Sequence, residues 1–257
     1  MDVTLPRGGF TVPINGFDMY CEVGGEGPLL VFLPGGMVGV DMHRPLVETF
    51  RRHFTVLNAD GNGQGRSSLG PGPITYVSLA ADLVALLDHL GIAEADFFGL
   101  GDGGVCGLHL LIDFSHRVRS VALSGAPYAH SAYTDFGRSF IERIAEQMAA
   151  PSGLLKMFAD AYATVSPQPE QFDEMVQRLV RTWVSQPNFN RAMLATIDKP
   201  TLIISSDRDE FIPEAEFRRM AMWIPSATMA QIPGMGHVPG VFQDVLADAV
   251  VEFLRTR

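Results

Sequence analysis

Three short stretches of the sequence carry residue types that could do chemistry. The stretch "IPGMGH" ends in His237, and an imidazole in a glycine-rich loop can act as a general base near neutral pH. The stretch "SSDRDEF" holds two carboxylates, Asp207 and Asp209, either of which could orient that imidazole. The stretch "FFGLGDGG" has the pattern of a strand that turns sharply into a helix, a turn that usually presents a nucleophile. Its presenting position holds Gly101, which has no side chain.

Strands and helices must position these residues. Short apolar runs alternate with helical patterns, and continuous apolar strands separated by helices predict an α/β fold whose parallel sheet is covered on both faces. In the helical stretch "VSLAADLVALLDHLG", Leu79, Leu83 and Leu86 share one face. Ser78 is the expected N-cap of this helix, and Gly91 is its expected stop. The predicted strands are "GPLLVFL", "HFTVLNA", "ADFFGL", "VRSVALSG", "TLIISSD" and "ATMAQIP".

The alternation breaks between two of the strands, in a stretch that is helical and rich in methionine and aromatic residues. We therefore predict a helical lid over residues 128–196, inserted in a core domain formed by residues 1–127 and 197–257. Most apolar side chains at helical spacing pack a core, and the remainder should line an apolar pocket. The residues that we expect to touch a ligand there are Tyr128, Met157, Phe158 and Trp183.

Composition limits the partners of the chain. Hydrophobic residues make up 47% of the 257 residues and charged ones 19%, which is typical of a soluble globular protein. The net charge of −10 opposes binding to nucleic acid or to an anionic membrane, so we expect a small-molecule substrate. Neither a signal sequence nor an apolar run of membrane-spanning length is recognisable, which predicts a cytoplasmic protein. The oligomeric state is not predicted.

Cofactor and metal sites are not expected. The two cysteines, Cys21 and Cys106, lie far apart and have no metal-ligand spacing. Residues 99–104 satisfy the loose Gly-x-Gly-x-x-Gly pattern of dinucleotide-binding loops. That motif requires the first strand of its own βαβ unit, whereas these glycines follow a later strand.

Four motifs in order along the chain resemble those of the α/β-hydrolase-fold superfamily. "VFLPGG" (31–36) resembles the strand and oxyanion-hole turn, with Pro34 in place of the usual histidine. "DGNGQGRS" (60–67) resembles the Asp-x-x-Gly-x-Gly-x-Ser loop. "LIISSDRDEFIP" (202–213) resembles the strand end that supplies the triad acid, and "IPGMGHVP" (232–239) resembles the loop that supplies the triad histidine. The resemblance covers nearly the whole chain outside the lid and implies the α/β-hydrolase fold, a mostly parallel sheet flanked by helices.

Two registers compete at the elbow. In the family's Gly-x-nucleophile-x-Gly pattern, Gly99 and Gly103 match the outer glycines and Gly101 takes the nucleophile position. A shift by one residue would make Asp102 the nucleophile, as in dehalogenases and epoxide hydrolases, but it would put Leu100 where a small residue is needed. We therefore prefer the first register. Gly101 would adopt the strained positive-φ turn easily, yet it offers no group that could form an acyl-enzyme, and one sequence leaves open whether it replaced a serine.

The resemblance implies a His-Asp dyad and an oxyanion hole. His237 matches the family's base, and Asp209, four residues before Pro213, matches the orienting acid better than Asp207. Backbone N–H groups of Gly36 or its neighbour Met37, together with that of Asp102, are the expected oxyanion donors. Such donors need no side chain at the nucleophile position.

Two classes of function follow. The first is an enzyme that polarises a carbonyl and moves a proton through His237 and Asp209 in ester, lactone or carbon–carbon bond hydrolysis, or in related lyase or cyclase chemistry. The second is a protein of the same fold that binds an apolar ligand and performs no chemistry. An oriented histidine favours the enzyme, because a pure binding protein gains nothing from it.

Overall fold

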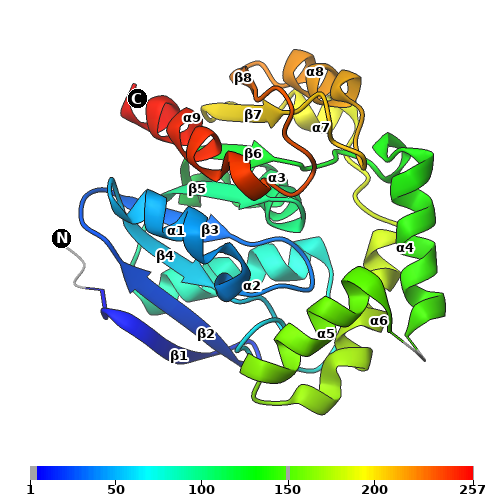
Figure 1. Cartoon of the computed structure of the whole chain (residues 1–257). Coiled ribbons are helices and arrows are strands. Elements are labelled where there is room, and N and C mark those ends of the chain that lie inside the picture. Colours follow the sequence, from blue (N-terminus) through cyan, green and yellow to red (C-terminus); the bar gives the residue numbers. More distant parts are fainter. Residues whose placement is uncertain (1–4, 149–150, 257) are drawn as a thin grey trace.

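The computed structural model describes residues 5–148 and 151–256, which form one eight-stranded sheet with helices on both faces (Figure 1). The strand order is β1-β2-β4-β3-β5-β6-β7-β8, and all pairings from β4 to β8 are parallel. The strands are β1 Gly8–Ile14, β2 Phe17–Gly24, β3 Leu29–Leu33, β4 Thr55–Ala59, β5 Ala95–Leu100, β6 Val118–Ser124, β7 Thr201–Ser205 and β8 Ala227–Gln231. The helices are α1 Arg44–Arg51, α2 Tyr76–His89, α3 Asp102–Asp113, α4 Asp135–Gln147, α5 Gly153–Val165, α6 Phe172–Trp183, α7 Arg191–Leu194, α8 Glu214–Trp223 and α9 Gln243–Arg255.

The sheet separates two apolar cores because successive side chains of a strand point to opposite faces. In β3, Leu30 and Phe32 pack with α1 and α9, whereas Val31 and Leu33 pack on the other face with α2, α3 and α8. Strands β3, β4 and β7 are buried on both faces, which explains their largely apolar sequence.

An antiparallel hairpin at the edge of the sheet was not predicted. Strands β1 and β2 pair around Asn15 and Gly16, which have φ values of 47° and 92°. Positive φ at both central residues defines the hairpin turn that Asn-Gly favours. The Asn-Gly dipeptide between the apolar-rich stretches "FTVPI" and "FDMYCEV" was the sequence signal for the missed hairpin.

The N-terminus of α2 differs from the prediction. Thr75, not Ser78, is the N-cap, and the Thr75 side chain accepts a hydrogen bond from the backbone N–H of Ser78. Ser78 lies at the third helical position and its hydroxyl accepts from the N–H of Thr75, which completes a capping box. The helix therefore begins at Tyr76, and this start directs the Tyr76 ring inward.

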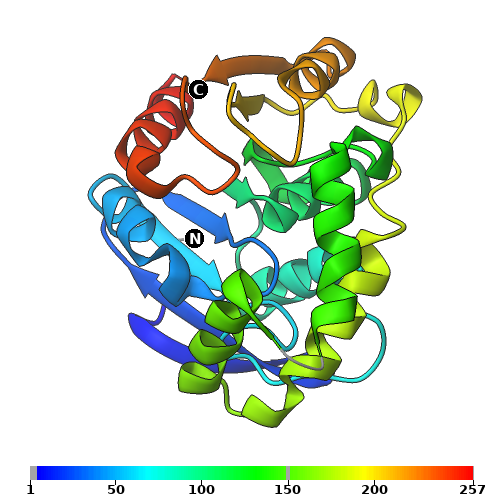
Figure 2. The same ribbon diagram turned by 45° about the vertical axis from the view of Figure 1, so that its right-hand side comes forward.

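Helices α4 to α7 connect β6 to β7, and α4, α5 and α6 lie beyond the carboxyl ends of the parallel strands (Figures 1 and 2). Met175 and Val176 of α6 are fully buried in the same core as α2 and α3. A separate lid domain over residues 128–196 stays a prediction, although the described residues of this connection are helical apart from turns and one isolated bridge.

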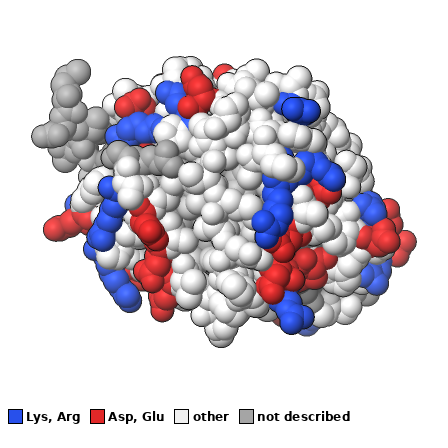
Figure 3. Space-filling view, turned by 90° about the horizontal axis from the view of Figure 1, so that it is seen from above, with Lys and Arg blue, Asp and Glu red and all other residues white. Residues whose placement is uncertain are grey.

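Within the described ranges, no helix combines the length and apolar character that crossing a membrane requires. On the face shown in Figure 3, cationic and anionic side chains are intermixed at the borders of an uncharged central area.

Candidate active site

The turn from β5 to α3 brings Gly101 to the carboxyl edge of the sheet. Gly101 has φ 56° and ψ −118°, and its N–H donates to the Ser124 carbonyl at 2.9 Å. A Cβ added to Gly101 would have two nearest neighbours, the Gly35 Cα and the His237 Nε2, each 3.9 Å away. A side chain at this position would therefore point at the imidazole.

Both glycines that flank this position are required by close backbone approach. A Cβ on Gly99 would lie 2.4 Å from the Gly103 carbonyl oxygen, and one on Gly103 would lie 2.0 Å from the Leu33 carbonyl oxygen. This crowding is the steric reason for small residues in the Gly-x-x-x-Gly turn.

His237 and Asp209 form a hydrogen-bonded pair. The Nδ1 of His237 lies 3.1 Å from both carboxylate oxygens of Asp209. Asp209 Oδ1 also accepts from the backbone N–H groups of Phe211 and Ile212, at 2.9 Å each, and these bonds orient the carboxylate. Asp207 instead accepts from the Gly234 N–H and has no contact with the imidazole.

Acidic neighbours raise the pKa of His237. Burial alone would lower the pKa of His237, but the hydrogen bond and charge of Asp209, with the charges of Glu210 and Asp102, raise it above its ordinary value. Glu210 also accepts from the backbone N–H of His237, and the Phe211 ring lies 4.6 Å from the imidazole, centroid to centroid. The unbound Nε2 is the atom that faces Gly101.

The Asp102 carboxyl group lies at the first residue of α3 and is held from two sides. Tyr76 donates its hydroxyl to Asp102 Oδ1 at 2.9 Å, and the Trp183 indole donates to Oδ2 at 2.7 Å. Burial raises the pKa of Asp102, while the two hydrogen bonds and the charge of His237 oppose that rise. The carboxyl group thus has neither Asp209 nor His237 as a hydrogen-bond partner.

The turn after β3 passes directly against this carboxyl group. A Cβ on Gly36 would lie 2.2 Å from Asp102 Oδ2 and 2.6 Å from Trp183 Cζ2, so only glycine fits there. Met37 has a φ of 63°, a conformation that costs energy for a residue with a side chain. The oxyanion role of the Gly36, Met37 and Asp102 N–H groups stays a prediction.

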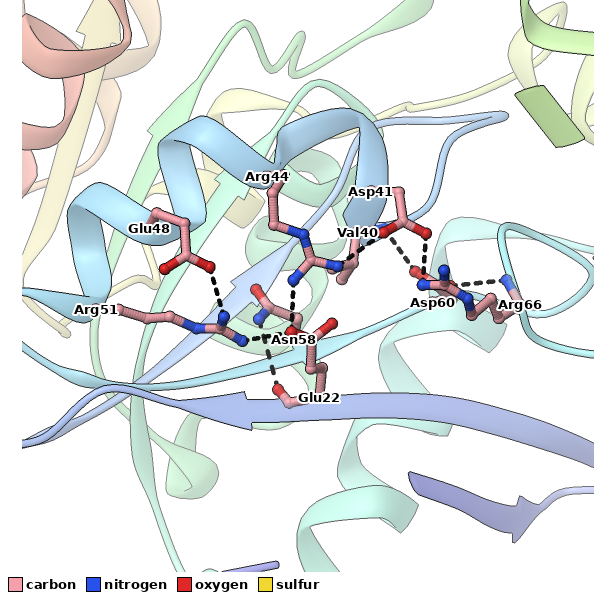
Figure 4. A network of polar contacts seen from close by, with 9 residues as sticks. All are labelled: Glu22, Val40, Asp41, Arg44, Glu48, Arg51, Asn58, Asp60 and Arg66. Carbon is pink, nitrogen blue, oxygen red and sulfur yellow. Dashed lines mark hydrogen bonds and ion pairs between the residues drawn. The ribbon is translucent and has the colours of Figure 1, made fainter. Parts of the chain in front are cut away.

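Polar contacts fix the segment that follows Met37 to the sheet (Figure 4). The buried Asp60 accepts from the Val40 N–H through Oδ1 and from the Arg66 N–H through Oδ2. Burial raises the pKa of Asp60 to about 6, although these bonds oppose the rise. Asp60 begins the predicted Asp-x-x-Gly-x-Gly-x-Ser loop, so that motif supports the turn next to the site.

Ion pairs surround these bonds (Figure 4). Arg44 bridges Glu22 of β2 and Asp41, and Arg66 also pairs with Asp41. Burial would raise the pKa of Glu22, but hydrogen bonds from Arg44 and Arg51 lower it below its ordinary value. The segment 40–44 is therefore tied to β2 and to the loop that follows β4.

A cavity of about 320 Å³ opens in front of Gly101, Asp102 and His237. Its lining is mostly apolar, and no lysine or arginine is among the described residues that line it. Met157, Phe158 and Trp183, three of the predicted ligand contacts, lie on its wall.

Tyr128, the fourth predicted ligand contact, is not among the described residues that line this cavity. Its hydroxyl donates to Glu216 of α8, and its ring packs on Trp223. These contacts hold the side chain against α8, and the preceding residue, Pro127, lines the cavity.

Three lining or supporting residues were not identified from the sequence. His43 lines the cavity, and its buried Nε2 has no partner among the described residues. Burial lowers the pKa of His43 to about 4.

Tyr76 and Tyr133 are buried beside Asp102. Burial is the main cause that raises the pKa of each tyrosine, and the charge of Asp102 raises it further. The predicted helix start at Ser78 left Tyr76 outside the helix, whereas the capping box of Thr75 and Ser78 would have placed it at the first helical position.

Comparison with known proteins places the chain in a family. Residues 28–243 match the family model of the alpha/beta hydrolase fold, so the chain belongs to that family and the predicted fold is confirmed. It is 26% identical over 256 residues to a putative carbamate hydrolase from Azorhizobium caulinodans, covering 89% of this chain and 93% of that one.

Solved structures share the fold. A hydrolase from Pseudomonas aeruginosa superposes with a TM-score of 0.76 at 23% identity, covering 96% of this chain and 98% of that one. An enol-lactonase from Burkholderia xenovorans superposes with a TM-score of 0.75 at 24% identity, covering 95% and 99%.

Proposed function

We propose that the protein is an enzyme that acts on a small, largely apolar carbonyl compound through the His237–Asp209 dyad, without a covalent intermediate at residue 101. The observation that carries this proposal is the 3.9 Å between a Cβ position at Gly101 and His237 Nε2. The base thus faces space that a nucleophilic side chain would otherwise fill.

This arrangement supports general base catalysis on a bound substrate or a water molecule. The Nε2 of His237 takes a proton, and Asp209 holds the ring and stabilises the imidazolium that forms. Negative charge develops on the carbonyl oxygen, for which the N–H groups of Gly36 or Met37 and of Asp102 are the proposed donors. One such donor typically contributes about 2.7–4 kcal/mol to the transition state.

The cavity favours an uncharged substrate. Asp102 and Glu210 are among its lining residues, and the described lining holds no lysine or arginine that could neutralise an anionic ligand. Apolar side chains such as Phe140, Ile141 and Ile144 supply most of the remaining surface. We expect an ester, a lactone or a ketone without a free carboxylate.

The names of similar proteins support a carbonyl substrate. One relative is the putative carbamate hydrolase. Another is the 3-oxoadipate enol-lactonase of Acinetobacter baylyi, to which this chain is 34% identical over 97 residues. Both names describe reactions at a carbonyl group. Ester, lactone or carbon–carbon bond hydrolysis and related lyase or cyclase reactions all use a base beside a polarised carbonyl.

Asp102 fits poorly as a nucleophile of the epoxide hydrolase or dehalogenase type. Both of its oxygens already accept hydrogen bonds, and the positive φ of the elbow belongs to Gly101. A purely binding protein of this fold would have no use for the pairing of His237 with Asp209.

A panel of neutral short-chain esters, lactones and 1,3-diketones tests the proposal. His237→Ala should reduce turnover of the accepted compound by about 10²–10⁴-fold. The exposed His116 in the turn after α3 offers a matched control, and His116→Ala should leave turnover unchanged. Equal rates in both variants would remove His237 from the mechanism, and tight binding without turnover would favour the binding protein.

A further inference from the structure

Asp102 separates two cavities. In front of it lies the cavity that His237 faces, and behind it lies a chamber of about 40 Å³ between α2, α3 and the sheet. Among the described residues, Asp102 is the one that lines both.

Besides Asp102, three polar side chains among the described residues line the rear chamber, whose surface is otherwise mostly apolar. Asp60, Gln64 and Asp82 line it, and burial raises the pKa of each of the two carboxyl groups to about 6. Gln64 is 5% exposed, and its Oε1 has no partner among the described residues. A single water needs about 10–15 Å³, so the chamber has room for water that bonds to these groups.

On the front side, the Asp102 carboxyl group lines the cavity beside the turn that holds the proposed oxyanion donors. Its Oδ2 abuts Gly36, one of the proposed oxyanion donors. An ionised carboxylate there would repel the charge that develops on the substrate oxygen, whereas a neutral carboxyl group could donate to it.

We propose that Asp102 is a second catalytic residue, a general acid that delivers a proton to the carbonyl oxygen of the neutral substrate while His237 withdraws one. This rests on the proposed function and adds a group to it. Tyr76 and Trp183 are positioning residues, because each holds one oxygen of the carboxyl group.

The proton transfers balance. His237 Nε2 takes a proton from the substrate α-carbon or from an attacking water, and the released electron pair moves toward the carbonyl. The carbonyl oxygen takes the Asp102 proton, so the substrate stays neutral while the enzyme holds an imidazolium and a carboxylate. In hydrolysis, the imidazolium then gives its proton to the leaving group as the bond to the carbonyl carbon breaks, and the Asp102 carboxylate takes back the hydroxyl proton as the carbonyl re-forms. In proton abstraction from the α-carbon, the imidazolium loses its proton to solvent and Asp102 regains one through the rear chamber.

Trp183 reports on the protonation of Asp102 without any substrate. The chain has two tryptophans, and only the indole of Trp183 donates to Asp102. In an NMR titration of the full-length protein, the Trp183 indole N–H resonance should shift with a midpoint above the ordinary aspartate value of 3.8. Trp223, packed on Tyr128, is the internal control, and Trp223→Phe assigns the two signals.

Variants distinguish Asp102 from its neighbours in this titration. Asp102→Asn should abolish the transition, and Asp209→Asn should preserve it. Tyr76→Phe should move the midpoint to higher pH, because the Tyr76 hydrogen bond lowers the pKa of Asp102. A Trp183 signal without a transition above pH 3.8, or with the same transition in Asp102→Asn, would overturn the proposal.

The pH dependence of turnover tests the direction of proton transfer. The reaction requires a neutral His237 imidazole and a protonated Asp102 carboxyl group at the same time. The turnover rate of the compound that the panel identifies should therefore follow a bell-shaped curve against pH. Asp102→Asn should lower kcat by about 10²-fold and remove the alkaline limb, leaving a rate that rises with pH. Loss of the acid limb, or an unchanged bell, would show that Asp102 is not the acid. Activity that survives His237→Ala would instead refute the proposed function itself.

Discussion

Gly36 and Asp102 compete for the same space. The Asp102 Oδ2 occupies a position 2.2 Å from where a Cβ of residue 36 would lie, so the carboxyl group can turn toward the cavity only because residue 36 is glycine.

Gly36→Ala should therefore displace the Asp102 carboxyl group and Trp183, and it should reduce turnover by at least about 10²-fold. Gly35→Ala is the matched control, because its Cβ would meet only the Leu100 carbonyl oxygen at an ordinary 3.5 Å. Steady-state kinetics of both variants, with circular dichroism to verify folding, measures the difference. Equal activity would show that the space beside Gly36 has no role in the reaction.

The two carboxylates of the β7 loop should differ in importance. Asp209→Asn should impair turnover much more than Asp207→Asn, since only Asp209 contacts the imidazole. It should also lower the pKa of His237, because Asp209 raises that value, and the acid limb of the rate profile should move to lower pH. A stronger effect of Asp207→Asn would contradict the assignment.

A serine at the elbow should gain reactivity and lose stability. In Gly101→Ser, the new hydroxyl would lie next to His237 Nε2, and mass spectrometry after incubation with an activated short-chain ester should detect acylation at residue 101. The φ of 56° should cost on the order of 1–3 kcal/mol of unfolding free energy. Gly101→Ala should show the same loss of stability without acylation. A serine variant as stable as the parent would contradict the strain argument.

The buried Asp82 should make the protein less stable as pH rises. Its folded pKa of about 6 exceeds the ordinary 3.8, so the folded state resists ionisation, and stability is lost as pH rises from 3.8 to 6. Asp82→Asn keeps the acceptor for Asn15 and should stabilise the protein at neutral pH by up to about 3 kcal/mol, but not at pH 3.8. Urea unfolding at the two pH values measures this, with the exposed Asp248→Asn as a control that should show no such difference.

Much of the fold follows from local sequence. Apolar runs such as "LLVFL" are long enough for a strand and too uniform for an amphipathic helix, so they predicted a buried parallel sheet. The glycines of the elbow were informative because close backbone approach excludes other residues. The Asn15–Gly16 hairpin was missed although its dipeptide is a strong turn signal.

Contacts between distant elements could not be predicted in the same way. Tyr76, Asp102 and Trp183 come from three helices, and no spacing along the chain indicates that they meet. Likewise, the position of Tyr128 after a strand end says nothing about α8, whose Glu216 accepts a hydrogen bond from the Tyr128 hydroxyl.

The helices between β6 and β7 differ in how firmly they are packed against the core. Helix α6 is anchored in the main core through Met175 and Val176, whereas about half of the described residues of α5 are exposed and α5 lines a third cavity of about 230 Å³. That cavity and the cavity in front of Gly101 and His237 share four of the described lining residues, Met37, Val38, Met42 and Phe158. The wall between the two cavities is therefore partly made of flexible methionine side chains. We expect ligands to enter and leave along α5 as these side chains rotate, while α6 keeps its position. The rate of product release should then depend on α5 rather than on the His237–Asp209 pair.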